Sequence, residues 1–264
     1  MDGKIYILQA DSKFIIVYSR KLDGYWKPKE LKNTNFNRPQ DIAACSARKV
    51  LCILDQSCIW EVDINHKITV FVKLPQIGVY RTMSAAGKDI VVTSSNTIRT
   101  YVCSLIGKPA SSKARIPEGL RKSVMKPWHA LEIDNGHVIA HIEAAKYHRV
   151  SKILQSQRNK AQVEVSTYGK EAGAGIDELS NPVYLAADDG HVFVADHDNQ
   201  RIVVLDRYKL ERRMIIDLPE TCYPSRLCYV DEHALLLVGM SNGSVITYKS
   251  TRHVLFNHRQ IRDS

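Results

Sequence analysis

The stretch NPVYLAADDGHVFVADHDNQRIVVLD, residues 181–206, combines short apolar runs with two polar turns. Runs of β-branched and aromatic residues separated by Asp, Asn and Gly predict antiparallel strands joined by tight turns. The polar residues that begin at Asp196 raise a second possibility, a metal-binding loop. An EF-hand calcium loop would need a glycine and a distant glutamate at fixed offsets, and neither is present. We therefore interpret the segment as a hairpin turn in which Asp196 accepts hydrogen bonds and Arg201 pairs with it.

The same arrangement recurs along the chain. A proline or basic residue opens an apolar strand, which is followed by a turn, two further apolar strands and a looser outer strand. The opening positions are separated by 42, 46, 55 and 42 residues; they are Pro39, Arg81, Pro127, Pro182 and Pro224. A period of about 40–50 residues with four strands each predicts the blades of a β-propeller.

We therefore expect an all-β protein, a six-bladed β-propeller of four-stranded antiparallel blades that forms a single domain over residues 1–264. The expected blades cover residues 1–35, 36–78, 79–123, 124–178, 179–220 and 221–258. Residues 4–9, 13–18 and 25–31 match only the second, third and outer strands of the first blade, so its inner strand is missing. Because natural proteins cover unpaired strand edges, we expect an upstream segment of a longer protein, or the tail after His258, to supply that strand.

The quoted stretch also resembles the NHL repeat in its proline, the apolar-Ala-Asp end of its second strand, its asparagine and the Arg-Ile start of its third strand. The other repeats match more loosely. Asp55 keeps the acidic residue, whereas Ser94, His141 and Gly239 stand at that point in other repeats. The resemblance covers nearly the whole chain. It implies a six-bladed NHL propeller similar to the C-terminal domain of tripartite-motif ubiquitin ligases, where such propellers bind RNA or protein.

Positive charge is concentrated in the middle of the chain. The formal net charge is +9, and residues 99–170 hold 13 Lys and Arg against 5 Asp and Glu. Clustered positive charge favours an anionic partner, although a merely solvated basic surface is an alternative. The NHL resemblance implies a binding face made of the loops that open the inner strands and those that join second to third strands. On this face and on the basic segment 113–126 we expect the partner-binding residues Arg38, Tyr80, Arg81, Lys126, Asn181, Tyr223, Lys113, Arg115, Arg121 and Lys122.

Basic and aromatic side chains of this kind hold phosphates and stack on unpaired bases. The sequence therefore predicts a non-catalytic module that binds single-stranded RNA, and the NHL resemblance implies that it could be part of a larger ubiquitin-ligase-type protein. The alternative is a propeller that recognises a protein partner. A third hypothesis is a calcium-dependent hydrolase or lactonase, for which Asp41 and Glu132 lie near inner strands, but no complete set of ligands is readable. We expect no cofactor, no metal and no small-molecule substrate.

Two further patterns suggest chemistry but have structural explanations. The segment GMSNG, residues 239–243, matches the nucleophile-elbow pattern around Ser241, yet Asn242-Gly243 predicts a hairpin turn between two strands. Two histidines on one strand face are too few for a metal centre, so we interpret the neighbouring histidines as structural; they are His129, His137, His141 and His148.

The six cysteines are scattered, without the CxxC pairs of a zinc site, and are expected to be reduced and buried. The apolar runs are far shorter than the roughly 20 residues that span a bilayer. The N-terminus lacks the features of a signal peptide. We expect a cytoplasmic protein without membrane contact.

Overall fold

The computed structural model describes residues 4–8, 14–20, 26–32, 35–45, 48–75, 79–86, 89–94, 98–102, 110–113, 125–133, 136–143, 146–155, 163–251 and 254–261. These residues form small antiparallel sheets, and their only helix is the three-residue 3-10 turn η1 (Asp231–His233). No helix in the described ranges has the length and hydropathy needed to cross a membrane. The chain divides into two compact units, residues 1–115 and 116–264, which are considered one at a time.

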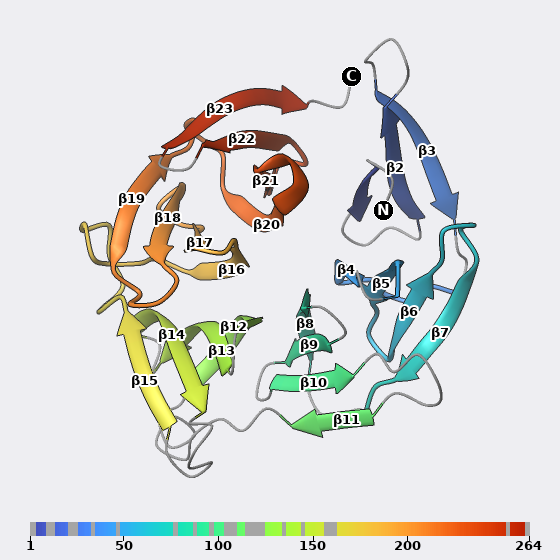
Figure 1. The fold of residues 1–264 in the computed structure, drawn as a ribbon, viewed down its shortest axis with the longest axis horizontal. Coiled ribbons are helices and arrows are strands. Elements are labelled where there is room, and N and C mark those ends of the chain that lie inside the picture. Colours follow the sequence, from blue (N-terminus) through green and yellow to red (C-terminus); the bar gives the residue numbers. More distant parts are fainter. Residues whose placement is uncertain are drawn as a thin grey trace. The chain divides into compact units, whose positions relative to one another are not determined.

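The first unit contains three sheets of consecutive strands (Figure 1). The first sheet has three strands, β1 (Ile5–Leu8), β2 (Phe14–Arg20) and β3 (Trp26–Lys32). The second has four, β4 (Asp41–Cys45), β5 (Val50–Leu54), β6 (Cys58–Val62) and β7 (Ile68–Lys73). The third has β8 (Tyr80–Ala86), β9 (Asp89–Ser94), β10 (Ile98–Val102) and β11 (Ala110–Lys113).

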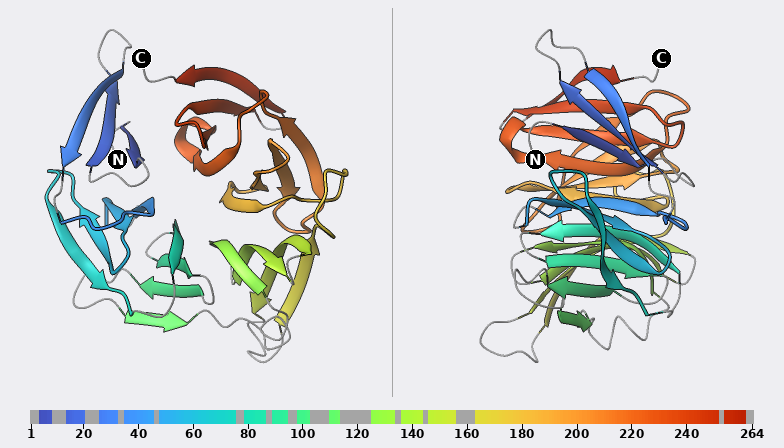
Figure 2. Two further views of the ribbon diagram at one scale, coloured as in Figure 1. Left: turned by 180° about the vertical axis from the view of Figure 1, so that it is seen from behind. Right: turned by 90° about the vertical axis from the view of Figure 1, so that its right-hand side faces the viewer.

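The second unit contains three four-stranded sheets, coloured from green to red in Figures 1 and 2. They comprise β12 (Met125–Ile133), β13 (Gly136–Glu143), β14 (Tyr147–Gln155) and β15 (Val163–Tyr168); β16 (Pro182–Ala187), β17 (His191–Asp196), β18 (Arg201–Asp206) and β19 (Arg212–Asp217); and β20 (Pro224–Val230), β21 (Leu235–Met240), β22 (Val245–Thr251) and β23 (Val254–Ile261). Every pair of neighbouring strands is antiparallel. This is the all-β propeller arrangement that the sequence predicts.

The strands of the quoted stretch are apolar at successive positions because both faces of their sheet are buried. Successive side chains of a strand point to opposite faces. Val192 and Val194 accordingly join a core with β12–β15, in which they pack with Val138 and Val150. Phe193 and other alternate residues of the sheet join a second core with β20–β23, which includes Leu236, Val238 and Ile246. Burial of these side chains holds the three sheets of the second unit together.

The first unit is built in the same way. Leu54 and Ile59 of the second sheet pack against Met83, Ile90 and Val92 of the third sheet. The opposite face of the second sheet carries Leu51, Ile53 and Val62, which pack with Ile15 and Val17 of the first sheet. Within each unit, two successive sheets therefore share one apolar core.

A β-bulge marks the start of the first strand in four of the sheets. It follows Tyr80, Pro127, Pro182 and Pro224, which pair at or near the ends of the second strands with Ser94, His141, Asp196 and Met240. The register corrects two positions assigned from the sequence. Tyr80, and not Arg81, corresponds to the opening prolines, and Met240, and not Gly239, corresponds to Asp196. Arg81 is the bulged residue itself, because no partner on β9 opposes it.

The first sheet has three strands where the other five have four, as the sequence predicts for the first blade. Strand β1 pairs with β2 and lies at the edge of its sheet. Residues 259–261 of the tail, one of the two expected sources of the missing strand, belong instead to β23 and pair with β22, and residues 262–264 lie outside the described residues. The single-domain boundaries assigned to residues 1–264 remain a prediction.

Candidate binding surface

Connections at one end of the sheets in the second unit lie side by side. We call them the loop surface and define it as residues 146, 169–181, 197–200, 218–223 and 241–244. Backbone hydrogen bonds join its members: the N–H of His197 donates to the carbonyl of Asn181 over 3.2 Å, and that of Ser241 donates to the carbonyl of Tyr223 over 2.9 Å. The loops that open first strands therefore meet the turns between second and third strands, as the NHL resemblance implied.

The buried carboxylate of Asp196 holds the loops of this surface in place through hydrogen bonds. Its side chain is fully buried at the end of β17. One carboxylate oxygen accepts the N–H of Ser180 at 2.6 Å, and the other accepts Asn199 Nδ2 at 2.8 Å and Arg201 Nε at 2.7 Å. Burial raises the pKa of Asp196, and these three donors oppose the rise. The segment is thus a turn organised by an acid and an arginine, as predicted from the sequence.

Asp55 has the same role in the first unit. Its side chain is 1% exposed and accepts the backbone N–H groups of Asn37 and Arg38 at 2.9 and 2.7 Å. A third donor is Trp60 Nε1, at 3.1 Å. Trp60 follows Asp55 by five residues, the same offset that separates Arg201 from Asp196. The repeat therefore preserves the buried acid and exchanges the guanidinium for an indole donor.

Four polar and aromatic side chains gather on the loop surface around Asn181, which has a left-handed φ of 59°. Its backbone N–H donates to His148 Nδ1 at 2.8 Å, and its Nδ2 donates to Asp198 Oδ1 at 3.3 Å. His197 Nδ1 lies 2.7 Å from the same Asp198 oxygen, and the His197 ring contacts that of Tyr223 in a tilted arrangement, with centroids 5.2 Å apart. We call these five residues the Asn181 cluster.

The Asn181 cluster contains a buried polar atom, Asn181 Oδ1, and an exposed aromatic side chain, Tyr223. Asn181 Oδ1 is buried, and it accepts no hydrogen bond in the structure. Burial lowers the pKa of His148, which suits the neutral ring that accepts the Asn181 N–H. Tyr223 is 36% exposed. A partner would therefore meet an aromatic ring, an imidazole and a carboxylate within one small area.

The charge of the loop surface differs from the basic face that the sequence suggested. Its lysines are Lys146 and Lys170, whereas its acids are Glu171, Asp177, Glu178, Asp198 and Glu220. Two cations against five carboxylates give a locally negative balance. Of the 13 basic residues counted between positions 99 and 170, this surface therefore carries two, Lys146 and Lys170.

The predicted binding residues divide into three groups. Asn181 and Tyr223 lie together in the Asn181 cluster, while Lys126 is exposed on β12. Arg38 is exposed and Arg81 half-buried in the first unit, where Tyr80 begins β8 and Lys113 ends β11. The other three lie outside the described residues; they are Arg115, Arg121 and Lys122. His148 was missed because it reaches Asn181 from strand β14 of the preceding sheet, whereas His197 and Asp198 lie in the β17–β18 turn of the same sheet and were interpreted only as turn residues.

Other residues that the sequence raised as possible catalytic or metal-binding positions make structural contacts within the sheets. Asp41 is buried, and its carboxylate accepts the backbone N–H of Met83 at 2.7 Å. His129 accepts the N–H of Leu185 and stacks on Tyr184, with ring centroids 3.8 Å apart. His141 is buried with Nε2 2.8 Å from Ser151 Oγ, and burial, assisted by Arg149, lowers its pKa to about 4.

Ser241 lies in the turn between β21 and β22, as the Asn242-Gly243 pair predicts, and Gly243 has a φ of 85°. Within the described ranges, no three His, Cys, Asp or Glu side chains converge as metal ligands. The cysteines within the described ranges are free thiols, of which Cys45, Cys52, Cys58 and Cys222 are buried. Cys228 is exposed, contrary to the expectation of uniform burial, and Cys103 lies outside the described residues.

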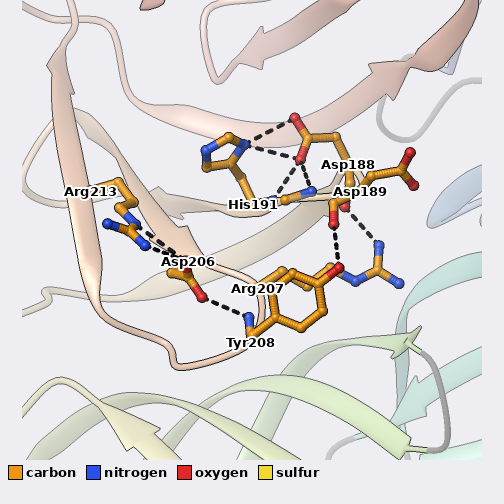
Figure 3. Close-up of polar contacts among 8 residues, drawn as sticks. Asp188, Asp189, His191, Asp206, Arg207, Tyr208 and Arg213 are labelled. Carbon is orange, nitrogen blue, oxygen red and sulfur yellow. Dashed lines mark hydrogen bonds and ion pairs between the residues drawn. The ribbon is translucent and has the colours of Figure 1, made fainter. Parts of the chain in front are cut away.

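A polar network closes the turns at the opposite end of the β16–β19 sheet (Figure 3). One Asp188 oxygen accepts the N–H groups of Gly190 and His191 at 2.8 and 2.6 Å. Arg207 Nη1 donates to the carbonyl of Asp188 at 2.7 Å, and Tyr208 Oη donates to that of Asp189 at 3.2 Å. These contacts are internal to the turns, so we assign the network to the scaffold.

A buried lysine connects two sheets at this end of the second unit. Lys152 is 3% exposed, and its Nζ donates to the carbonyls of Arg207 and Tyr208, each at 2.9 Å. Near the same turn, Arg213 Nη2 lies 2.6 Å from Asp206 Oδ2. Hydrogen bonding from Arg213, supported by the N–H groups of Lys209 and Tyr208, lowers the pKa of Asp206 to about 2.

Comparisons with known proteins identify the fold and no family. No protein-family model matches the chain, and no curated protein matches it in sequence. A chain of a nidogen/laminin complex has a TM-score of 0.67 and 12% identity, with 96% of this chain and 92% of that chain covered. The NHL resemblance therefore gains no support from sequence comparison.

Two bacterial proteins have a similar fold. A putative 6-phosphogluconolactonase of Bacteroides uniformis gives a TM-score of 0.63 at 11% identity, covering 95% of this chain and 79% of that chain. Virginiamycin B lyase of Staphylococcus aureus gives 0.58 at 13% identity, covering 97% of this chain and 80% of that chain. At such identities the likeness shows a β-propeller and nothing about activity.

Proposed function

We propose that this protein is a non-catalytic binding module that recognises a protein partner through the loop surface of its second unit. The observation that carries the proposal is the composition of that surface, which holds five carboxylates, two lysines and the exposed ring of Tyr223. Phosphates would be repelled by such a balance, whereas a partner carrying Lys or Arg beside an apolar patch would be attracted. Aromatic side chains of this kind are common anchors in protein interfaces.

Two observations support recognition over chemistry. The acids that could suggest a hydrolase are engaged elsewhere, since Asp41 accepts the Met83 N–H and Asp196 holds Arg201. Among propellers of similar fold, one comes from a nidogen/laminin complex and another from a mitotic checkpoint complex, with a TM-score of 0.60 at 8% identity. Both are chains within protein assemblies.

Recognition of single-stranded RNA is the second candidate function. It is favoured by the exposed side chains of Arg38 and Lys126 and by the basic composition of residues 99–170. Lys and Arg in that segment would neutralise phosphates and give salt-sensitive binding. Loss of RNA affinity and of its salt dependence on Arg38→Glu with Arg81→Glu would support this candidate.

The two candidates are separated by presenting the purified chain with two probes, a displayed library of disulfide-cyclised random peptides and a randomised single-stranded RNA pool. We expect enrichment of peptides that combine aromatic or aliphatic residues with Lys or Arg. Their affinity should fall about tenfold or more on Tyr223→Ala. Tyr208→Ala is the matched control, because Tyr208 is 64% exposed at the opposite end of the neighbouring sheet.

The outcome decides between the functions. If the peptides bind the Tyr223→Ala and Tyr208→Ala variants with equal affinity, the loop surface is not their binding site. An RNA motif that is enriched at moderate salt, with no enriched peptide, would overturn protein recognition in favour of RNA.

A further inference from the structure

The connection between β15 and β16 is the longest loop that the structure describes in the second unit. It runs over residues 169–181, thirteen residues, whereas the equivalent connection between β19 and β20 has six, residues 218–223. In Figures 1 and 2 it protrudes as a gold loop at the outer side of the β16–β19 sheet. Ordered loops of this length without strands of their own are uncommon and usually functional.

The base of this loop is closed. Ala172 forms a parallel bridge with Leu179, and the N–H of Gly173 donates to the carbonyl of Leu179 at 3.1 Å. The N–H of Ala172 also donates to the carbonyl of Lys146 at 2.8 Å. Residues 172–179 therefore form a compact loop with adjacent ends, of the kind known as an Ω-loop. We call this segment the braced loop.

The interior of the braced loop is held by the buried Asp196–Arg201 pair. Arg201 donates from Nη1 to the carbonyl of Ala174 at 3.2 Å, and from Nη2 to those of Gly175 and Glu178 at 3.0 and 2.8 Å. One buried guanidinium thus orders three carbonyls of the loop, and it is itself oriented by a fully buried carboxylate.

Three further side chains complete the bracing. Asn199 Nδ2 donates to the carbonyl of Gly173 at 2.9 Å, and Tyr168 Oη donates to that of Ile176 at 3.0 Å. Glu178 Oε2 accepts the N–H of Gly175 at 2.8 Å, and a Cβ on Gly175 would lie 2.7 Å from that oxygen. The loop backbone is therefore ordered before any partner arrives, which lowers the entropy cost of binding.

This bracing presents an apolar side chain to solvent. Ile176 is 61% exposed, although the carbonyl of the same residue is held by Tyr168. Asp177 follows it with a side chain that is 52% exposed. Its ion pair with Arg212 is long, at 3.5 Å, and lies at the surface, so it contributes little and is readily exchanged for another cation.

We propose that the braced loop is a preformed recognition element, in which Ile176 inserts into an apolar pocket of a protein partner and Asp177 pairs with a Lys or Arg at the rim of that pocket. This inference rests on the proposed function and specifies the anchor and the chemistry of the partner. The exposed side chain of Ile176 would bury apolar area in the partner, and the Asp177 carboxylate would orient the partner through its cation. The hydrogen bonds from Arg201 keep the loop backbone rigid.

The test uses the same library of disulfide-cyclised peptides, selected on the full chain and then measured on variants. We expect a class of peptides with an apolar cluster beside Lys or Arg that binds Ile176→Asp at least about tenfold more weakly and retains binding to Ile176→Leu. Ile64→Asp is the matched control, because Ile64 is also 61% exposed and lies in the turn between β6 and β7.

The outcomes are distinguishable from those of the proposed function. Peptides that depend on Tyr223 but bind Ile176→Asp with full affinity would overturn the role of the braced loop and leave protein recognition standing. Equal losses with Ile176→Asp and Ile64→Asp would also overturn it. A library that yields no binders would refute protein recognition itself, and with it the anchor.

Discussion

Replacing Arg201 by methionine should destabilise this protein far more than the same replacement of an exposed arginine that also forms an ion pair. Arg201 is 7% exposed and donates to the Asp196 carboxylate and to three loop carbonyls. Methionine preserves much of the side-chain volume and leaves Asp196 buried without its cation. Removing one partner of a buried ion pair costs about 3–5 kcal/mol.

That loss is a large part of the roughly 5–15 kcal/mol by which native proteins are stable. At about 2–4 °C of melting temperature per kcal/mol for chains of this size, the variant should melt about 10 °C lower. Urea unfolding followed by circular dichroism, together with calorimetry, measures both quantities. Because Asp196→Ala disrupts the same pair, the double variant should cost less than the sum of the two single variants.

Arg213→Met is the matched control. Arg213 forms an equally short ion pair with Asp206 in the same sheet, at 2.6 Å, but its side chain is 54% exposed. Exposed pairs contribute less to stability than buried ones, so this variant should lose much less unfolding free energy than Arg201→Met. Equal destabilisation by Arg201→Met and Arg213→Met would refute the reasoning that burial of the pair, rather than its geometry, sets the cost.

Two other predictions concern the opposite end of the same sheet. The pKa of Asp206 is lowered to about 2 from an ordinary 3.8, so its contribution to stability is present above pH 4 and is lost as the pH falls towards 2. Asp206→Asn should therefore narrow the difference in unfolding free energy between pH 6 and pH 2.5, and an unchanged difference would contradict this assignment. Lys152→Met should cost about 1–3 kcal/mol in urea unfolding, because it leaves the carbonyls of Arg207 and Tyr208 without their donor; an unchanged midpoint would show that water replaces it.

The repeating sheets could be predicted from the sequence because their signals are local. Strand length, apolar runs and turn residues recur at nearly constant spacing, and each described sheet is made of strands consecutive in the chain. The role of Asp196 was also readable, since its donors Asn199 and Arg201 follow within five residues. The sequence did not show that Trp60 takes the place that Arg201 has in the later repeat. Their equivalence is evident only in the structure, where the Trp60 indole donates to Asp55 as the Arg201 guanidinium donates to Asp196.

The site was less predictable because it depends on contacts between distant residues. Asn181 meets His148 across 33 positions in sequence, and no periodicity of the chain encodes that approach. The braced loop was unreadable for a similar reason. Its glycines suggest a flexible segment, whereas Arg201, more than twenty residues away, orders its carbonyls. Local composition describes what a loop favours on its own and does not include what its neighbours impose.

The order of strands within the sheets has a consequence for how the protein is made. Each described sheet pairs only neighbouring hairpins, so every strand finds its partner within a short length of chain. Loop-closure entropy is therefore small for each pairing, which favours rapid formation. During synthesis a sheet can form as soon as its last strand leaves the ribosome, before the next one exists. The apolar face that will later pack against the following sheet stays exposed until that sheet is synthesised. A pause in translation between repeats would therefore leave this apolar face exposed to chaperones.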